Sequence, residues 1–364
     1  MESADYIVVG SGLTGATIAR RLHDVGREVL ILDRRNHLGG NVHDHRHESG
    51  VIIHTYGPHY FRTSSEKIWD FANRFSDFYD YQPCLLTLVD GEKVPWPLWK
   101  SWISSKLGNS WQPEFKGVPA NFEEAALSLM PRFIYDRFVK EYNEKQWGVP
   151  AKSLDAELCT RFDVRELDEP KLKPDAKYQG IPTKGYAGWM ASMVDGIQSI
   201  LRVDYLRQKG EFLAKKKLIF TGPIDEYFDF SLGKLKYRGQ RRENIYHPDK
   251  EFVQEVGQIN APQHKDGPWV RWLEWKHMQP KRDQAAIRGT VVTTETPYTP
   301  ANPHEYEYPF PDKVNANLYK AYRTMAESQF GVLICGRLGE YRYYDMDQAI
   351  GRALGIAERL VKEN

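Results

Sequence analysis

Three spaced glycines follow a short apolar run near the start of the chain. The run extends from Tyr6 to Val9, and the glycines after it are Gly10, Gly12 and Gly15. Such a run predicts a buried parallel strand. The glycines allow a tight turn, a close approach of the backbone to a pyrophosphate and close packing of the next helix. Because the N-terminus of that helix then faces a phosphate, the spacing predicts a dinucleotide site.

A carboxylate ends the second predicted strand, which runs from Val29 to Asp33. At about 20 residues beyond the glycine turn, an acidic side chain can accept the ribose hydroxyls of an adenosine. A purely structural strand-helix-strand unit is the alternative, but the order of strand, turn, helix, strand and acid favours a dinucleotide. A second glycine pair, Gly39 and Gly40, resembles the extended fingerprint of FAD-binding flavoproteins. We therefore expect FAD rather than NAD.

Other segments carry side chains that can bind anions, move protons or cover a flat base. The segment 54–59 has a histidine at each end and a glycine-proline pair that forces a turn, and a loop histidine can donate a hydrogen bond or carry a proton. Arg161 and Arg165 could bind a diphosphate, and Trp147 is expected in a loop where it could cover a base. The alternatives are surface histidines, solvated arginines and a tryptophan that packs between domains.

The composition narrows the class of protein. A chain of 364 residues can form two or three modules, and a formal net charge of +1 gives no electrostatic reason to expect a nucleic-acid partner. The cysteines Cys84, Cys159 and Cys335 lie far apart without metal-type spacing, and their odd number argues against a disulfide framework. We expect no metal and a reducing cytoplasmic location. The start does not resemble a signal peptide, and no apolar run approaches the ~18 residues of a membrane span, so we expect a soluble protein without a membrane partner.

The elements that must position these residues divide into three predicted modules. Residues 1–80, 182–228 and 321–364 are expected to form a discontinuous Rossmann-like FAD-binding domain of the α/β class. Residues 81–181 are expected to form an inserted helical domain with the mobile Trp147 loop, and residues 229–320 an antiparallel β-sheet domain with strands such as 289–294. Within the first module we expect helices at 64–74, 189–200 and 348–361, with strands at 217–220 and 331–336.

Together these segments resemble the UDP-galactopyranose mutase family. The matching pieces occur in family order over nearly the whole chain: the N-terminal fingerprint, the loop that ends at 57–61, and the runs 145–148, 178–182 and 336–348. The resemblance implies a mutase that converts UDP-galactopyranose to UDP-galactofuranose. In this family reduced FAD is the nucleophile, and its N5 atom forms an adduct with the sugar. It also implies an external reductant such as NAD(P)H, a nucleotide-sugar partner and a possible homodimer.

The resemblance also implies roles for individual residues. The cofactor would be bound by Gly10, Gly12, Leu13, Thr14, Gly15, Asp33, Arg34, Gly39, Gly40, Asn41, His54, Tyr56, Gly57, Pro58, His59, Gly336, Arg337, Asp345 and Met346. The substrate would be bound by Tyr142, Asn143, Trp147, Arg161, Arg271, Tyr308 and Tyr343. The catalytic residues would be His59, Arg161, Arg271, Tyr343 and Asp345.

Several positions depart from the family pattern, and all lie on the substrate side. They are Arg62 for a histidine, Pro83-Cys84 for an arginine, Asn143 for a threonine, Leu172 for a tyrosine and Glu307 for one of two paired tyrosines. The same chemistry on UDP-N-acetylgalactosamine, a dTDP-deoxyhexose or a GDP-heptose is therefore an alternative. A flavin oxidoreductase of the amine-oxidase type and an inactive nucleotide-sugar-binding protein are two further alternatives.

Overall fold

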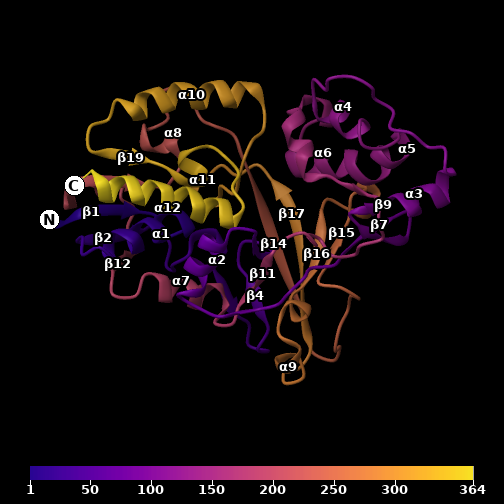
Figure 1. Cartoon of the computed structure of the whole chain (residues 1–364), viewed down its shortest axis with the longest axis horizontal. Coiled ribbons are helices and arrows are strands. Elements are labelled where there is room, and N and C mark those ends of the chain that lie inside the picture. The colour runs from indigo at the N-terminus through magenta and orange to yellow at the C-terminus, as the bar shows by residue number, and fades with distance from the viewer. Residues whose placement is uncertain (364) are drawn as a thin grey trace.

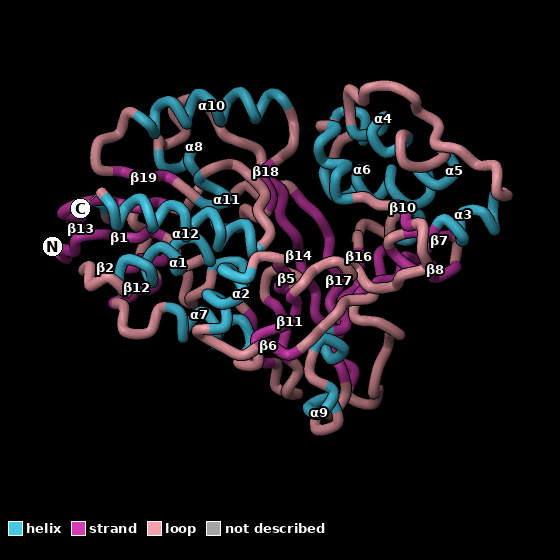
Figure 2. Tube along the Cα trace, viewed as in Figure 1, coloured by secondary structure: helices cyan, strands magenta, loops and turns pink. Residues whose placement is uncertain are grey.

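A computed structural model describes residues 1–363 of the chain, and for Arg161 it describes the backbone alone. In Figure 1 a sheet covered by helices lies on the left, where both chain ends are found. Long strands cross the middle of the molecule, and a separate helical region lies on the right. Figure 2 shows the same division by kind of element. The chain is a mixed α/β protein with a Rossmann-like domain, as the sequence predicted.

A five-stranded parallel sheet carries the glycine turn, with the strand order β12-β2-β1-β13-β19. Alternate residues of the central strand enter different cores: Tyr6 and Val8 pack in one, and Ile7 packs in another. Both faces of the sheet are therefore covered, which explains the continuous apolar run. The strands are β12 (Gln198–Leu201), β2 (Val29–Asp33), β1 (Glu2–Val9), β13 (Phe212–Phe220) and β19 (Val332–Ile334).

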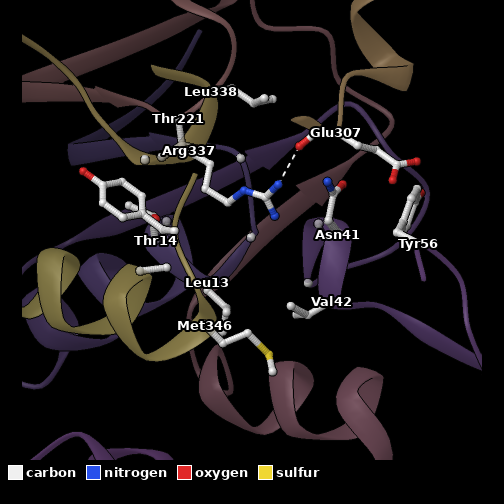
Figure 3. A pocket seen from close by; sticks show the side chains of 18 of the residues that line it. Leu13, Thr14, Asn41, Val42, Tyr56, Thr221, Glu307, Arg337, Leu338 and Met346 are labelled. Carbon is white, nitrogen blue, oxygen red and sulfur yellow. Dashed lines mark hydrogen bonds between the residues drawn. The ribbon is translucent and has the colours of Figure 1, made fainter. Parts of the chain in front are cut away.

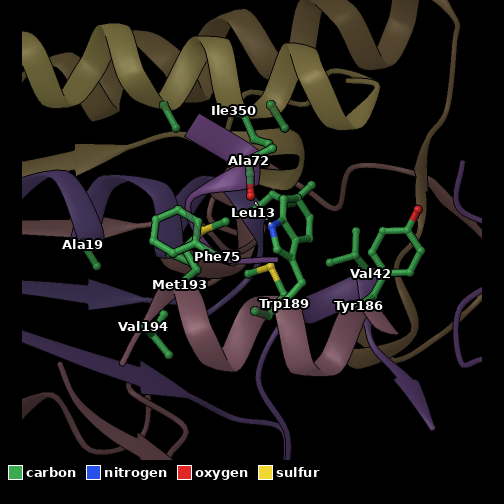
Figure 4. Packing of buried hydrophobic residues seen from close by; sticks show 14 of the residues in the cluster. Leu13, Ala19, Val42, Ala72, Phe75, Tyr186, Trp189, Met193, Val194 and Ile350 are labelled. Carbon is green, nitrogen blue, oxygen red and sulfur yellow. Dashed lines mark hydrogen bonds between the residues drawn. The ribbon is translucent and has the colours of Figure 1, made fainter. Parts of the chain in front are cut away.

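Helices from distant parts of the chain pack around this sheet. Figure 4 shows the largest core, where the Trp189 ring lies among side chains from several helices. Trp189 is fully buried, and its indole N–H donates a hydrogen bond of 2.9 Å to the carbonyl of Ala72. The helices of this half are α1 (Leu13–His23), α2 (Glu66–Asn73), α7 (Gly185–Met193), α8 (Ile224–Tyr227), α10 (Lys313–Glu327), α11 (Gly336–Gly339) and α12 (Met346–Lys362).

The helix predicted over residues 189–200 is wrong in its second half. Helix α7 ends at Met193, the backbone turns at Gly196 with φ of +77°, and residues 198–201 form the edge strand β12. This strand pairs in parallel with β2, more than 160 residues earlier in the chain. The pairing overrides local helix propensity, which is a weak preference beside tertiary contacts.

A second sheet of seven strands crosses the middle of the molecule, in the order β18-β14-β17-β16-β15-β7-β8. Its pairs are antiparallel, except that β15 and β7 are parallel. Its strands are β18 (Tyr308–Pro309), β14 (Tyr237–His247), β17 (Thr290–Tyr298), β16 (Arg271–Glu274), β15 (Gln258–Asn260), β7 (Leu85–Val89) and β8 (Glu92–Trp96). The short helix α9 (Lys281–Gln284) lies at one end of this sheet (Figure 1).

Two predicted module boundaries are therefore wrong. Residues 85–96, assigned to the helical domain, belong to the seven-stranded sheet because β7 pairs with β15, a partner distant in sequence. Helix α10 begins at Lys313, inside the segment assigned to the β-sheet domain. The first error comes from a pairing between segments that are far apart in the chain, which leaves no local pattern. The second overlooks a local signal, because the side chain of Asp312 caps the first turn of α10.

The helical region lies beyond this sheet and has its own core of aromatic and aliphatic side chains. Its elements are α3 (Lys100–Leu107), α4 (Phe122–Leu127), α5 (Arg132–Ile134), a π-helical segment (Tyr135–Lys140), α6 (Glu141–Trp147) and the 3-10 helices Ala151–Ser153 and Ala156–Arg161. The short strands outside the two large sheets are β3 (Asp44–Arg46), β4 (Ile52–His54), β5 (Phe61–Thr63), β6 (Phe78–Tyr79), β9 (Leu98–Trp99), β10 (Val164–Arg165) and β11 (Tyr178–Pro182).

Candidate active site

A cavity of about 380 Å³ lies along the ends of β1, β2 and β19. Figure 3 shows the Arg337 side chain extending through it toward Glu307. Many of the residues predicted to bind the cofactor line this cavity. They are Gly10, Gly12, Leu13, Thr14, Gly15, Asp33, Arg34, Gly39, Gly40, Asn41, Tyr56, Pro58, His59, Gly336, Arg337, Asp345 and Met346.

The three glycines of the turn are needed for different reasons. Gly10 has φ of +103°, and a Cβ atom on Gly15 would lie 1.9 Å from the carbonyl oxygen of Gly10, so the fold itself requires both glycines. Gly12 has φ of −67°, and a Cβ atom there would meet only the Cα of Gly40, at 3.9 Å. The protein could accommodate a larger residue at 12. Because the fold does not need a glycine at 12 and Gly12 lines the cavity, the open space beside it is consistent with the close approach of a ligand.

Asp33 lines the cavity but uses most of its acceptors within the protein. Its Oδ2 accepts hydrogen bonds from the backbone N–H of Ser11 at 2.7 Å and from the Ser11 hydroxyl at 2.6 Å. Its Oδ1 accepts from the backbone N–H of Arg35 at 2.9 Å. A carboxylate offers about four lone-pair sites, so one remains for a ribose hydroxyl. Nearby, Arg34 binds Glu226 through two hydrogen bonds of 2.8 and 2.9 Å, a pair that no motif indicated.

The loop Gly57–His59 forms another part of the cavity wall. His59 Nδ1 donates to the carbonyl of Gly57 at 2.8 Å, and its backbone N–H donates to His54 Nδ1 at 3.1 Å. Burial, and then the charge of Arg337, lower the pKa of His59 to about 4, so the ring is neutral and its Nε2 is an acceptor. His54 and Gly57 do not line the cavity. Their placement does not support the predicted contact with the cofactor, because His54 and the carbonyl of Gly57 bind His59 instead, and the Cα of Gly57 faces Glu295.

The side chain of Arg337 shows what kind of ligand the cavity fits. Its Nη2 donates to the carbonyl of Glu307 at 2.5 Å, whereas its buried Nε has no hydrogen-bond partner among the described residues. Buried donors are normally satisfied, so this atom indicates an acceptor supplied from the cavity. The space beside Gly12, the remaining acceptor site of Asp33 and the donor of Arg337 together fit a dinucleotide cofactor, as the expected FAD is.

A second cavity of about 240 Å³ adjoins the first. Its wall includes the predicted residues Tyr142, Asn143 and Trp147 together with the rings of Trp96 and Phe162. Five residues line both cavities, so the two spaces meet at their side chains: Leu85, Gln258, Arg271, Tyr308 and Tyr343. Sequence reasoning missed Leu85 and Gln258, because both lie on short strands without a motif. The side chain of Arg161 lies outside the part of the chain that the structure describes.

Trp147 is the last residue of α6 and is 6% exposed, so the predicted loop position is wrong. Its ring meets that of Phe310 edge to face, with the ring centroids 5.8 Å apart. The buried Arg238 donates hydrogen bonds to the carbonyls of Gln146 at 2.7 Å and Lys145 at 3.1 Å. These carbonyls belong to the last turn of the helix, where carbonyls lack partners within the helix. Arg238 therefore fixes α6 to β14.

Lys145 fixes the same helix to the loop between β15 and β16. Its Nζ donates to the carbonyls of Ala261 at 3.0 Å, Gln263 at 2.6 Å and Trp269 at 3.0 Å, which uses all three donors of an ammonium group. Burial lowers the pKa of Lys145 to about 8. The helix carries one wall of the second cavity and β15 and β16 carry another, so this contact sets the separation of the two walls.

We expect Lys145→Met to lower the free energy of unfolding by about 1–3 kcal/mol, because it leaves three carbonyls without their donor. Denaturant titration measures this change. Lys152→Met is the matched control, since Lys152 is exposed. If the Lys145→Met protein were as stable as the control, this would contradict the role of Lys145 in connecting the two walls of the second cavity.

A buried chain of ion pairs begins at the junction of the cavities. Arg271 binds Glu295, Glu295 accepts from Arg242 Nε at 2.7 Å, and both terminal nitrogens of Arg242 donate to Glu307 at 2.8 Å. Burial opposes the charge of Arg271, but Glu295 outweighs it and raises the pKa of Arg271 above its usual range. A Cβ atom on Gly57 would lie 2.8 Å from Glu295 Oε1, so the loop of His59 rests directly on this chain of charges.

Most of the positions that depart from the family pattern line these cavities, whereas Pro83 and Cys84 line neither. Arg62 Nη2 donates a hydrogen bond of 3.0 Å to Asp345 Oδ2, and both residues line the first cavity. Leu172 lines it too, and its backbone N–H donates to the carbonyl of Pro83 at 2.8 Å. Arg165, an alternative diphosphate ligand in the sequence, donates instead to the carbonyls of Glu169, Lys171 and Leu172. It therefore holds the segment that places Leu172.

Among the described residues no group of histidine, cysteine, aspartate or glutamate side chains could hold a metal ion. Likewise, no helix in the described part of the chain is long and apolar enough to cross a membrane.

Comparison with known proteins identifies the family. The family model for UDP-galactopyranose mutase matches residues 137–343, and the model for an NAD(P)-binding Rossmann-like domain matches residues 8–75. A probable UDP-galactopyranose mutase of Klebsiella pneumoniae is 30% identical, over 99% of this chain and 96% of the relative. The chain belongs to the UDP-galactopyranose mutase family. It is thus an isomerase of the mutase type, and its family implies a flavin cofactor.

Two further comparisons extend this assignment. A dTDP-fucopyranose mutase of Escherichia coli is also 30% identical, over 98% of both chains. The crystal structure of a reduced UDP-galactopyranose mutase superposes with a TM-score of 0.74 at 16% identity, and covers 99% of this chain and 96% of its own. The fold is therefore that of the mutase family along the whole chain, whereas relatives at equal identity differ in the sugar and the nucleotide that their names state.

Proposed function

We propose that this mutase interconverts the pyranose and furanose forms of a nucleotide sugar with reduced FAD, and that UDP-galactopyranose is its substrate. The observation that carries the proposal is the junction of the two cavities. Arg271, Tyr308 and Tyr343 line both, so a ligand in the aromatic second cavity could extend its diphosphate and sugar to a flavin in the first.

When bound and reduced, FAD would supply a nucleophilic N5 atom that bonds to the anomeric carbon of the sugar. The side chains at the junction bind and orient the substrate. Arg271 stabilises the negative charge that the departing diphosphate gains, in a site shielded from water. Burial raises the pKa of Tyr308 to about 12, so its hydroxyl stays protonated and can donate a hydrogen bond. The Cζ atom of Arg337 lies 5.9 Å from the ring centroid of Tyr308 and 5.1 Å from that of Tyr343. Arg337 therefore brings a positive charge to the flavin side.

The state of His59 gives a pH prediction. Its pKa is lowered to about 4, so the ring stays neutral from pH 8 down to about pH 5. We expect kcat/KM to show no step near pH 6.5 from this residue. Protein stability should fall as the pH decreases from 6.5 toward 4, because only the unfolded state binds the proton in that range. A step in kcat/KM near pH 6.5 that disappears in His59→Gln would contradict the neutral assignment.

The test of the proposal is anaerobic incubation of the purified protein, reduced with dithionite, with UDP-galactopyranose. Furanose product over many turnovers, absent with the oxidised protein, would support both the chemistry and the substrate. Reduction with NADH or NADPH in parallel samples identifies the electron donor. NADPH consumed in step with product, or oxygen consumed in step with product in a parallel aerobic sample, would instead indicate an oxidoreductase. No product with any nucleotide sugar, while FAD and nucleotide bind, would indicate an inactive binding protein.

A second candidate keeps the chemistry and changes the sugar or the nucleotide. Arg62 and Leu172 line the cofactor cavity, at positions where the family pattern has a histidine and a tyrosine. A relative named for dTDP-fucopyranose is as similar as the one named for UDP-galactopyranose. Turnover of UDP-N-acetylgalactosamine, dTDP-deoxyhexoses and a GDP-heptose beside UDP-galactopyranose separates the candidates.

We also propose a cytoplasmic location. It is supported by Cys84, Cys159 and Cys335, which are all free thiols. The homodimer stays a prediction from the family resemblance.

A further inference from the structure

Glu307 lies where the resemblance leads us to expect a tyrosine, and it faces the cofactor cavity. It immediately precedes β18, is 6% exposed and lines the cavity near Tyr56 (Figure 3). An unpaired carboxylate at this depth would be strongly unfavourable. The substitution of a neutral ring by a buried acid therefore needs a compensating partner.

The partner is Arg242, and through it Glu307 reaches both sides of the site. Both carboxylate oxygens accept from Arg242 at 2.8 Å, which is the bidentate geometry that fixes a guanidinium most firmly. The backbone carbonyl of Glu307 accepts from Arg337, the cation on the cofactor side, so the Glu307 carboxylate lies close to that cation without binding it. Arg242 also shares Glu295 with Arg271, the cation at the junction of the cavities.

The charges of this group do not cancel. The guanidinium groups of Arg242, Arg271 and Arg337 are accompanied by the carboxylates of Glu295 and Glu307. Within this group of five side chains one positive charge is left uncompensated, and without Glu307 there would be two. The cavity wall also carries other arginines and carboxylates, which the substitution of Glu307 leaves unchanged. In a buried site with a low effective dielectric constant, one charge acts over distances on the order of 10 Å.

We propose that Glu307 is a positioning residue whose side chain holds Arg242 beside the cofactor cavity and lowers the positive charge there by one. This inference rests on the proposed function, since the charge would act on the bound flavin and on the diphosphate. Limiting the positive charge keeps the reduced flavin electron-rich, as a nucleophile must be, and keeps the diphosphate from binding too tightly to be released. Arg242 and Glu307 act through neighbouring groups rather than on the substrate itself.

The test is Glu307→Gln, which keeps the shape of the side chain and removes its charge. With FAD bound, we expect the midpoint potential of the flavin to become more positive, because an added positive charge favours the anionic reduced form. We also expect UDP to bind roughly fivefold more tightly at low salt. Glu305→Gln is the matched control, because it removes the same charge two residues away at an exposed position, and it should leave both quantities unchanged.

A flavin potential in Glu307→Gln that is unchanged or more negative would overturn the proposal. Because loss of the ion pair could also disturb the fold, flavin content and melting temperature are measured in the same samples, and Glu307→Asp is tested beside them. Aspartate keeps the charge with a shorter reach, so its flavin potential should stay near that of the unmodified protein. A shift in Glu307→Asp as large as in Glu307→Gln would show that geometry and not charge matters. The potential is measured without substrate, so failure of this inference is distinguishable from failure of the proposed mutase reaction.

Discussion

Arg271→Ala is expected to lower kcat/KM by roughly 100- to 1000-fold while FAD stays bound. Arg271 lines both cavities, so its guanidinium lies where a diphosphate would cross from one to the other. A preorganised charge that faces the leaving group acts most strongly in the transition state, when the glycosidic bond breaks. Single-turnover measurements with the reduced protein, together with the flavin spectrum, separate chemistry from cofactor loss.

The same substitution also removes one partner of the buried Glu295, which keeps only Arg242. Breaking a buried pair is destabilising, so the melting temperature has to be measured beside the activity. Arg271→Lys keeps a positive charge but cannot donate in the same fork, and it should be intermediate in activity. Arg282→Ala removes an arginine that is 79% exposed and serves as the control. Full activity in Arg271→Ala would contradict the diphosphate role.

Gly12→Ala is expected to weaken FAD binding by roughly tenfold or more without unfolding the protein. The backbone at 12 is extended with φ of −67°, and a Cβ atom would meet nothing closer than the Cα of Gly40 at 3.9 Å. Only a ligand that approaches the turn would collide with the new methyl group. Flavin content after purification and titration of the apoprotein with FAD measure the effect.

Substitutions of two other glycines serve as controls for Gly12→Ala. Gly15→Ala places its Cβ 1.9 Å from the carbonyl oxygen of Gly10, so it should disturb the fold as well as the cofactor. Gly355 lies in α12 with nothing within 4 Å, so Gly355→Ala should leave FAD bound and stabilise the protein by about 0.5–1 kcal/mol. Normal FAD affinity in Gly12→Ala would show that the cofactor does not lie against this turn.

Much of the cofactor side follows from local patterns. The run before Gly10 and the acid at Asp33 belong to consecutive strands, and parallel strands place their carboxyl ends at one edge of a sheet. The last strand, 332–334, joins the same sheet beside β13 and brings Arg337 to that edge. Even here the structure adds a detail that no local pattern predicts. Ser11 and Arg35 donate hydrogen bonds to most of the acceptor sites of the Asp33 carboxylate.

The sequence by itself determined the family, the Rossmann-like fold and the glycine turn, because these depend on short motifs and on the period of apolar residues. Only the tertiary structure decided that β7 joins a sheet through β15, that Trp147 ends a fixed helix, and that Leu85 and Gln258 lie between the cavities. It alone also paired Glu307 with Arg242, 65 residues earlier. The physical reason is that buried charges and sheet edges take partners from distant parts of the chain, and local residue patterns carry no information about such partners.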